Sequence, residues 1–374
     1  MQSTKLIFSF YYKWWKNIDK FIFFLIILLF LIGLFFSLVS TSLIASDKLN
    51  TNDYTFFFKH LSFVVLGILI ILIFSSINQE KLFKLSPMIF LFSLISLFLV
   101  PIIGVEVNSA KRWIDLIFLP RFQPIELVKP FLIILISLIL SSEKFTNIYI
   151  KYLSSFLITL IVALLLVAQP DIGQTLLVFF SWSVLIFISG INIFFLITSC
   201  SILSLIFYYL VRFVPKFEYI KNRILSFFNT ETGTHNAQSE KAIDSITSGG
   251  YFGKGIGEGT LKNRVPEAHT DYIISVISEE FGVIAIILIL FLFLIFVYSV
   301  FKKVSLQNDE KIKLILVGCI SLILVQAIIH IGVNIRLFPT TGMTLPFISY
   351  GGSSILSISI LSGIILNLTK REIN

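Results

Sequence analysis

The fold is decided by the uncharged apolar stretch at residues 21–45, which reads FIFFLIILLFLIGLFFSLVSTSLIA. A bilayer core about 30 Å thick requires roughly 20 apolar residues in a helix, so this stretch is long enough to cross it. A cleaved signal peptide has a hydrophobic core of only about 7–15 residues, so we interpret residues 21–45 as a retained first span. Four basic residues precede it and predict a cytoplasmic N-terminus: Lys5, Lys13, Lys16 and Lys20.

Similar stretches recur along the whole chain of 374 residues. Hydrophobic residues make up 56% of the sequence and charged residues only 13%, whereas soluble domains carry about 25% charged residues. This composition excludes intrinsic disorder, a disulfide-framed secreted domain and a soluble enzyme. We therefore expect an all-α polytopic membrane protein with about ten transmembrane helices. The predicted spans lie near residues 21–45, 57–77, 86–104, 124–141, 151–168, 173–189, 192–214, 272–301, 312–335 and 344–368.

The distribution of basic residues predicts the orientation of these spans. The 29 Lys and Arg residues exceed the 21 Asp and Glu residues. With a cytoplasmic start, the short inside segments hold most of that excess, as the positive-inside rule requires, and nucleic acid is not needed as a partner. These inside residues are Lys81, Lys84, Lys144, Lys151, Lys302, Lys303, Lys311, Lys313, Lys370 and Arg371, against Lys48, Lys111, Arg112 and Arg121 outside. We expect both termini in the cytoplasm, a cytoplasmic segment at residues 1–20 and a membrane domain at residues 21–370.

One predicted outer loop, residues 215–271, is much longer than the others, polar and rich in glycine. Loops of this length without regular structure are usually functional or disordered. Its stretch SGGYFGKGIGEG at residues 248–259 has in places the spacing of a phosphate-cradling loop, but no strand precedes it and the Gly-Lys-Ser/Thr ending is missing. We interpret it as a flexible loop that approaches a substrate phosphate, with Lys254 as the candidate contact.

Charged residues beside or within the predicted spans are the strongest functional signal, because a charge at the bilayer centre costs at least about 2.5–3.5 kcal/mol. The fourth span opens with QPIELVK at residues 123–129, which places Glu126 and Lys129 on one helical face. They form either a structural ion pair or part of a substrate site. The preceding Lys111, Arg112 and the nearby Arg121 match phosphate oxygens of an external pyrophosphate, or alternatively contact anionic lipid headgroups.

Two further motifs carry carboxylates at the predicted outer surface. In QPDIG, residues 169–173, Asp171 either caps the returning helix or takes part in chemistry. In PEAHTD, residues 266–271, Asp271 at the membrane boundary could act as a general base on a sugar hydroxyl, or cap the eighth span together with Thr270.

Two polar features lie further along the chain. Glu279 and Glu280 lie two turns beyond Asp271 and could ligate a cation, or pair with Lys129 or another span. The last span is interrupted by Pro346 and by the glycines at residues 351–352. Irregular backbone of this kind is tolerated at membrane depth only where it faces protein or a cavity.

In this order, the segments KRWI (111–114), QPIELVK (123–129), QPDIG (169–173), PEAHTD (266–271) and LPFISYGGSS (345–354) resemble the SEDS family (shape, elongation, division and sporulation). The likeness extends from about residue 20 to residue 370. The segments SGGYFGKG, GEGT (257–260) and GMTLPF (342–347) are similar to the FtsW-type division branch. WIDL (113–116) and RFQP (121–124) are similar to the rod-shape branch.

The resemblance implies a ten-helix bundle that polymerises lipid II into peptidoglycan glycan strands and releases undecaprenyl pyrophosphate. Asp271 matches the family's essential aspartate, the base for the acceptor's 4-hydroxyl. Arg112, Lys129 and Arg121 would stabilise the leaving group, with Glu126 holding Lys129. The remaining candidate contacts to substrate or pyrophosphate are Lys111, Gln123, Asp171, Lys254 and His269. Ile125 stands where the family usually has Ser, and Ser109-Ala110-Lys111 replaces its usual Gly-x-Arg.

The resemblance also implies a divalent cation, Mg²⁺ or Mn²⁺, with Glu267 and Asp271 as candidate ligands, and no organic cofactor. The expected partners are lipid II, a class B penicillin-binding transpeptidase, other divisome membrane proteins and membrane lipids. The expected location is the bacterial inner membrane at the division septum, with the active site facing the periplasm. Three alternatives remain open: a rod-shape (elongation) polymerase, a lipid II flippase and a divisome scaffold.

Overall fold

The computed structural model describes residues 12–41, 54–107, 110–116, 119–145, 147–228, 234–261, 265 and 267–370. Lys5, Lys48, Pro266 and Arg371 lie outside these residues. Within them, each predicted span corresponds to a helix: α2 (Lys20–Thr41), α4 (Thr55–Ser76), α5 (Gln79–Ile103), α6 (Pro124–Leu140), α7 (Ile148–Ala168), α8 (Ile172–Ile188), α9 (Ile193–Phe213), α12 (Ile273–Leu306), α13 (Glu310–Asn334) and α14 (Gly352–Leu368). In the described part of the chain, seven of these are at least 18 residues long and apolar enough to cross a membrane. The protein is an all-α polytopic membrane protein, as predicted.

The polar residues that separate the predicted spans start the helices that follow them. Side-chain oxygens accept hydrogen bonds from backbone N–H groups of the first turn, which otherwise have no partner within the helix. The capping residues are Asn78 before α5, Asn147 before α7, Asp171 before α8, Asn192 before α9 and Asp309 before α13. The polar residues between the apolar stretches therefore mark where the next helix begins.

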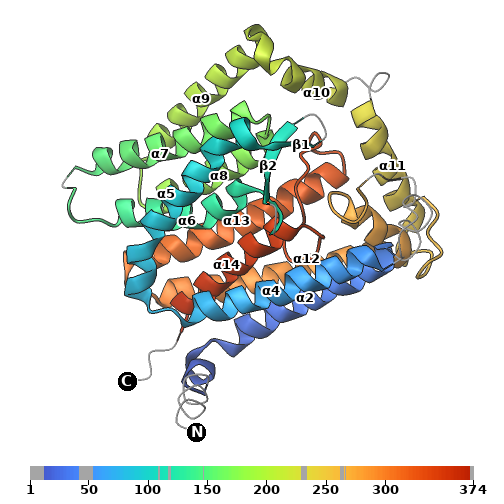
Figure 1. Cartoon of the computed structure of the whole chain (residues 1–374), viewed down its shortest axis with the longest axis horizontal. Helices are drawn as coiled ribbons and strands as arrows, with labels where there is room; N and C mark the ends of the chain where they lie inside the picture. The colour runs from blue at the N-terminus through green and yellow to red at the C-terminus, as the bar shows by residue number, and fades with distance from the viewer. Residues whose placement is uncertain are drawn as a thin grey trace.

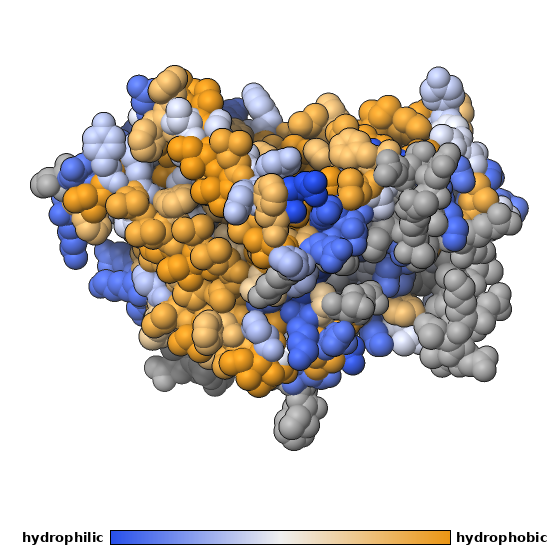
Figure 2. Space-filling model, turned by 90° about the horizontal axis from the view of Figure 1, so that it is seen from above, coloured by the Kyte–Doolittle hydropathy of each residue, from blue (hydrophilic) through white to orange (hydrophobic). Residues whose placement is uncertain are grey.

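The helices form a bundle in which α6, α13 and α14 are largely buried, whereas α9 has no buried residue and lies at the periphery (Figure 1). Figure 2 shows hydrophobic side chains over much of the left half of one face and along its upper edge to the right of the centre, with hydrophilic ones at the left margin, in the centre and at the right. Hydrophobic side chains over so much of a surface are typical of a membrane protein.

Two contacts join helix ends that the topology predicts to lie inside. The Nζ of Lys303, near the end of α12, lies 2.6 Å from Oδ2 of Asp19, just before α2. The Nε2 of Gln79, at the start of α5, donates to the carbonyl oxygen of Asn367 near the end of α14 at 3.3 Å. Each contact therefore joins two helix ends that the sequence predicts to lie on the same side of the membrane, and the orientation itself stays a prediction.

The segment between α5 and α6 contains strands, which the sequence did not predict. β1 (Val105–Val107), β2 (Ala110–Leu116) and β3 (Leu119–Phe122) form an antiparallel sheet in the order β1-β2-β3. Val, Trp, Ile and Phe residues alternate here with charged ones, a pattern that favours a half-buried strand over a loop.

The large loop at residues 215–271 is not without regular structure, so that expectation was wrong in part. It contains the short 3₁₀ helix η1 (Pro215–Phe217) and two α-helices, α10 (Glu218–Phe228) and α11 (Thr234–Gly249). α11 packs against the beginning of α12, at the right of Figure 1. The loop is therefore a folded cover over one end of the bundle.

Two spans differ from their predicted boundaries. α12 continues to Leu306 and is broken at Gly282, whose φ and ψ of 77° and 178° are not helical. The last span becomes helical only at Gly352, because residues 344–351 are irregular around Pro346. The second irregular region contacts the predicted site, where Tyr350 N–H donates to the carbonyl oxygen of His269.

Candidate active site at the outer end of the bundle

Asp271 ends a tight turn directly before α12. Three consecutive backbone N–H groups donate to the carbonyl oxygen of Glu267 at 3.0, 3.1 and 3.3 Å, those of Thr270, Asp271 and Tyr272. From α13, the Nδ2 of Asn334 donates to the carbonyl oxygen of Asp271 at 2.9 Å. The backbone of Asp271 is therefore fixed from two sides, while its side chain makes no contribution to capping α12.

The irregular segment at residues 339–351 faces this turn. A Cβ atom on Gly342 would lie 3.5 Å from Oδ2 of Asp271, so the glycine leaves space beside the carboxylate. The backbone N–H of Tyr350 donates to the carbonyl oxygen of His269 at 3.1 Å. The ring of His269 also lies 4.8 Å from that of Phe56 and 6.0 Å from that of Tyr350. His269 is thus held between α4 and the irregular segment.

The electrostatic surroundings suit Asp271 for proton transfer. The pKa of the Asp271 carboxyl is raised to about 7, chiefly by burial and also by the negative charge of Glu267, while the positive charges of Arg112 and Arg223 partly oppose that shift. Burial lowers the pKa of His269, which the charge of Glu267 partly offsets. Asp271 as a residue remains partly exposed. A carboxyl whose pKa lies near neutral pH can accept a proton as a general base.

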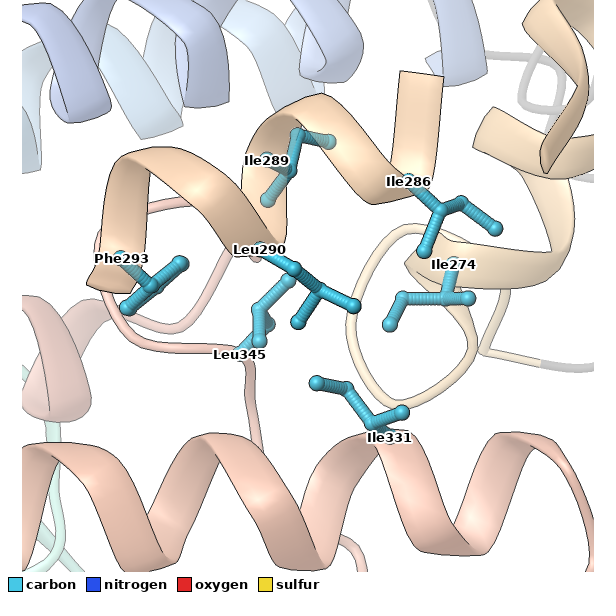
Figure 3. A pocket seen from close by; sticks show the side chains of 7 residues that line it. All are labelled: Ile274, Ile286, Ile289, Leu290, Phe293, Ile331 and Leu345. Atoms are coloured by element: carbon cyan, nitrogen blue, oxygen red, sulfur yellow. The ribbon is translucent and has the colours of Figure 1, made fainter. Parts of the chain in front are cut away.

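An apolar pocket begins one helical turn beyond Asp271, at Ile274. Figure 3 shows a small pocket lined by side chains from α12, α13 and the irregular segment, among them Ile274, Ile286, Ile331 and Leu345. Ile274 lies one turn beyond Asp271, and Ile286 reaches the same pocket from beyond the break in α12. Residues of α12 from both sides of the break therefore line this pocket.

Arg112 on β2 joins the sheet to the QPDIG motif. Its Nε donates to the carbonyl oxygen of Gln169 at 3.2 Å, its Nη2 donates to that of Pro170, and its Nε lies 3.7 Å from Oδ2 of Asp171. The Nε2 of Gln123 donates to the same Oδ2 at 3.2 Å. Burial raises the pKa of Asp171, and the charge of Arg112 opposes that shift. Asp171 thus caps α8, as one of the two predicted roles requires, and also pairs with Arg112; a role in the chemistry stays a prediction.

Glu126 and Lys129 form the predicted ion pair, with Lys129 Nζ 2.8 Å from Oε2 of Glu126. The side chains are 3% and 1% exposed. The Nε2 of Gln174 donates to Oε1 of Glu126 at 3.0 Å, and Lys129 Nζ donates to Oε1 of Gln326 at 3.4 Å. The Nε2 of Gln326 in turn donates to the carbonyl oxygen of Thr344 at 3.0 Å. The pair therefore connects α6, α8, α13 and the segment that faces Asp271.

Comparisons with known proteins identify the family of this chain. A model of the cell cycle protein family that includes FtsW, RodA and SpoVE matches residues 19–374. The chain belongs to this family.

Relatives of similar length share nearly the whole chain. A protein of Caulobacter vibrioides named probable peptidoglycan glycosyltransferase FtsW is 31% identical over 363 residues, 96% of this chain and 91% of its own. A protein of the same name from Haemophilus influenzae is 32% identical over 359 residues, 94% of this chain and 90% of its own.

Solved structures share the fold. One, described as the structural coordination of polymerization and crosslinking by a peptidoglycan synthase complex, contains a chain with a TM-score of 0.78 and 26% identity, covering 94% of this chain and 97% of that one. The rod shape determining protein RodA of Thermus thermophilus has a TM-score of 0.69 and 25% identity, covering 94% and 96%.

Three residues predicted to contact substrate or pyrophosphate have other surroundings than those described above for Asp271. Lys111 is exposed on β2. Arg121 on β3 pairs with Asp115 at 3.3 Å, and both side chains are about half exposed. Lys254 lies 3.3 Å from Oε1 of Glu279, which is fully buried. Lys254 therefore has a carboxylate partner within the protein.

Of the alternatives predicted for Glu279, the pairing with Lys129 is not the one found, since Lys254 pairs with Glu279 and Lys129 pairs with Glu126. Besides Lys254, Glu279 accepts hydrogen bonds from Oγ of Ser245 at 2.9 Å and from the backbone N–H of Leu261 at 2.9 Å. Those partners come from the large outer loop, so Glu279 holds that loop to α12. In the part of the chain that the structure describes, no group of three or more His, Cys, Asp or Glu side chains could hold a metal ion.

Sequence reasoning missed three residues of the site. Gln174 and Gln326 complete the surroundings of the buried ion pair, and polar amides within apolar helices were an available signal. The positive charge of Arg223 on α10 lowers the pKa of Asp271, although the two residues are far apart in the sequence. No local pattern could reveal Arg223, because the loop that carries it was not predicted to fold.

Proposed function

We propose that this protein is a peptidoglycan glycosyltransferase that polymerises lipid II into glycan strands and releases undecaprenyl pyrophosphate. The observation that carries this proposal is Asp271, whose carboxyl has a pKa raised to about 7 by burial and by Glu267, with the charges of Arg112 and Arg223 opposing that shift. The names of the relatives from Caulobacter vibrioides and Haemophilus influenzae support the same reaction class.

In the proposed reaction, the oxygen of the acceptor's 4-hydroxyl attacks the anomeric carbon of the growing chain. Asp271 accepts the proton of that hydroxyl. The bond from that carbon to the pyrophosphate oxygen breaks, and its electron pair leaves with undecaprenyl pyrophosphate, so the configuration inverts. Arg112 is placed to stabilise the leaving group, whose charge grows in the transition state. Lys129 is buried against Glu126, so we assign to it a positioning role through Gln326 and Thr344.

A divalent cation fits these residues only if substrate phosphates and water provide the ligands that the two carboxylates do not. Glu267 and Asp271 lie close enough for the charge of Glu267 to raise the pKa of Asp271. Mg²⁺ is usually held by one or two carboxylates and completes its coordination with water and substrate phosphates. When bound, such an ion would neutralise charge on the pyrophosphate.

The proposed setting is septal wall synthesis, with the active site on the periplasmic side of the inner membrane and a class B penicillin-binding transpeptidase as partner. The likeness to a chain of a peptidoglycan synthase complex supports a partner that crosslinks the strands. The relatives named FtsW, at 31–32% identity, favour the division branch over the RodA branch, at 25%. Other divisome membrane proteins remain proposed partners.

The test is a lipid II polymerisation assay of the purified full-length chain, with and without its co-purified transpeptidase. Polymer formed in either sample supports the proposal. A flippase would instead move labelled lipid II across vesicle membranes without making polymer, and a scaffold would do neither. Either result, obtained with folded protein in complex with its partner, overturns the proposal.

A further inference from the structure

The Gly-rich loop after α11 repairs the break in α12. At Gly282 the helical hydrogen bonds are interrupted, and loop residues 250–255 supply the missing backbone partners. The four hydrogen bonds are Lys254 N–H to Glu279 O at 2.8 Å, Gly255 N–H to Glu280 O at 3.1 Å, Val283 N–H to Gly250 O at 3.0 Å and Ile284 N–H to Tyr251 O at 3.3 Å. The loop is therefore fixed at one height along α12.

The break, to which the loop is bonded, is also the point along α12 where exposed apolar side chains begin. We call this row of exposed apolar side chains the lipid-facing side of α12. Before the break, residues 273–280 are buried. After it, exposed apolar side chains recur on the helix: Ile284, Ile287, Leu288, Phe291, Leu294, Tyr298 and Phe301. At 1.5 Å per residue, the rise from Ile284 to Phe301 is about 26 Å, close to the thickness of a bilayer core.

Two lysines follow the far end of this exposed apolar side. Lys302 and Lys303 follow Phe301 directly, and lysines at the end of a span extend to the membrane surface. Ile284 therefore lies at the opposite edge of the bilayer core, which the topology predicts to be the outer one. The loop residue bonded to Ile284 must lie at the same level.

The tip of this loop carries two aromatic side chains that no part of the described protein covers. Tyr251 is 76% exposed and Phe252 is 82% exposed, and Ile256 further along the loop is 64% exposed. Adjacent exposed aromatic residues are unfavourable in water, but aromatic side chains are favoured at the headgroup level of a membrane. Gly253 follows them with a φ of 79° against the backbone of Glu280, which holds the tip turned outward.

We propose that Tyr251 and Phe252 form an interfacial anchor that inserts into the headgroup region of the outer leaflet. The anchor fixes the depth of the break in α12, and with it the short segment that begins at Asp271. This inference depends on the lipid-facing side of α12 and not on the reaction assigned above. A protein surface as occupant is the competing outcome, and the continuity with the lipid-facing residues of α12 favours lipid.

The test places a nitroxide spin label at Phe252→Cys in the full-length chain, reconstituted in nanodiscs of phosphatidylethanolamine and phosphatidylglycerol. Cys200 is replaced by serine, and Cys319 stays because it is buried. The matched control is Lys241→Cys, an exposed position on α11 more than two turns before the loop. Power-saturation measurements compare collisions with oxygen, which concentrates in the bilayer, and with a water-soluble nickel chelate.

We expect the oxygen-to-nickel accessibility ratio to be several-fold higher at position 252 than at position 241. Equal ratios at the two positions would overturn the proposal. A second sample contains the co-purified transpeptidase. If position 252 is shielded from nickel only in that sample, the tip contacts the partner protein and the lipid anchor is wrong.

Discussion

Lys129 and Glu126 form an ion pair of 2.8 Å inside the helix bundle, and each charged group has one amide partner on another helix. Removing one member of such a pair leaves a buried charge and typically costs about 3–5 kcal/mol. We therefore expect Glu126→Gln to lower the thermal stability of the purified protein and to reduce polymerisation only in part.

The exchange Glu126→Lys with Lys129→Glu separates a structural role from a chemical one. If the pair only holds α6 against α8 and α13, the exchange restores both the melting temperature and the activity lost in Glu126→Gln. Restored stability without restored activity would show instead that a positive charge is required at position 129. Melting by intrinsic fluorescence and the lipid II assay provide the two measurements.

Replacing Asp271 tests the proposed base directly. Asp271→Asn keeps the size of the side chain and the backbone contacts to Glu267 and Asn334, which involve only main-chain atoms of Asp271. General base catalysis contributes about 10²–10⁴-fold, so we expect a loss of polymerisation of that order. Unchanged melting and co-purification with the transpeptidase are the controls. Glycan strands of normal amount from this variant would exclude Asp271 as the base.

The pH dependence should follow the ionisation of Asp271. A base must be deprotonated to act, so activity falls as the pH decreases through the pKa of about 7. The charge of Glu267 raises that pKa. Glu267→Gln should therefore lower it, and the acidic limb of the kcat/KM profile should move to lower pH. A profile that does not move would show that Asp271 does not set the limb.

Arg112 should act on the same profile with the opposite sign. Its positive charge lowers the pKa of Asp271, so Arg112→Gln should move the acidic limb to higher pH. Arg112→Lys keeps the charge but loses the planar donation to the carbonyl oxygens of Gln169 and Pro170. It should leave the limb in place while lowering kcat/KM. A limb that moves equally in both variants would assign the effect to lost structure instead of charge.

The sequence was sufficient for those features that depend on local spacing. The spans follow from apolar length, and the contact between Glu126 and Lys129 follows from a separation of three residues on a helix. Contacts between distant segments could not be derived, because Arg112 meets Asp171 only after β2 and α8 are brought together. The pairing of Glu279 with Lys254 could not be derived for the same reason, since it depends on how the loop packs against α12. The division into domains and the orientation of the termini stay predictions.

The break itself offers the sharpest stability test. A Cβ atom on Gly282 would lie 2.1 Å from the carbonyl oxygen of Tyr251, and its φ of 77° with ψ of 178° belongs to a region that is essentially restricted to glycine. Gly250 is a matched control, because its φ is also positive, at 57°, but no atom lies within 4 Å of an added Cβ.

Gly250→Ala should cost only the left-handed backbone term, about 1–2 kcal/mol, and keep polymerisation. Gly282→Ala should be clearly more destabilising, since the loop must move away from α12 and the segment carrying Asp271 loses its support. Its polymerisation should fall even at temperatures where the protein remains folded. Equal melting temperatures and equal activities in the two alanine variants would mean that the contact between loop and break does not position Asp271.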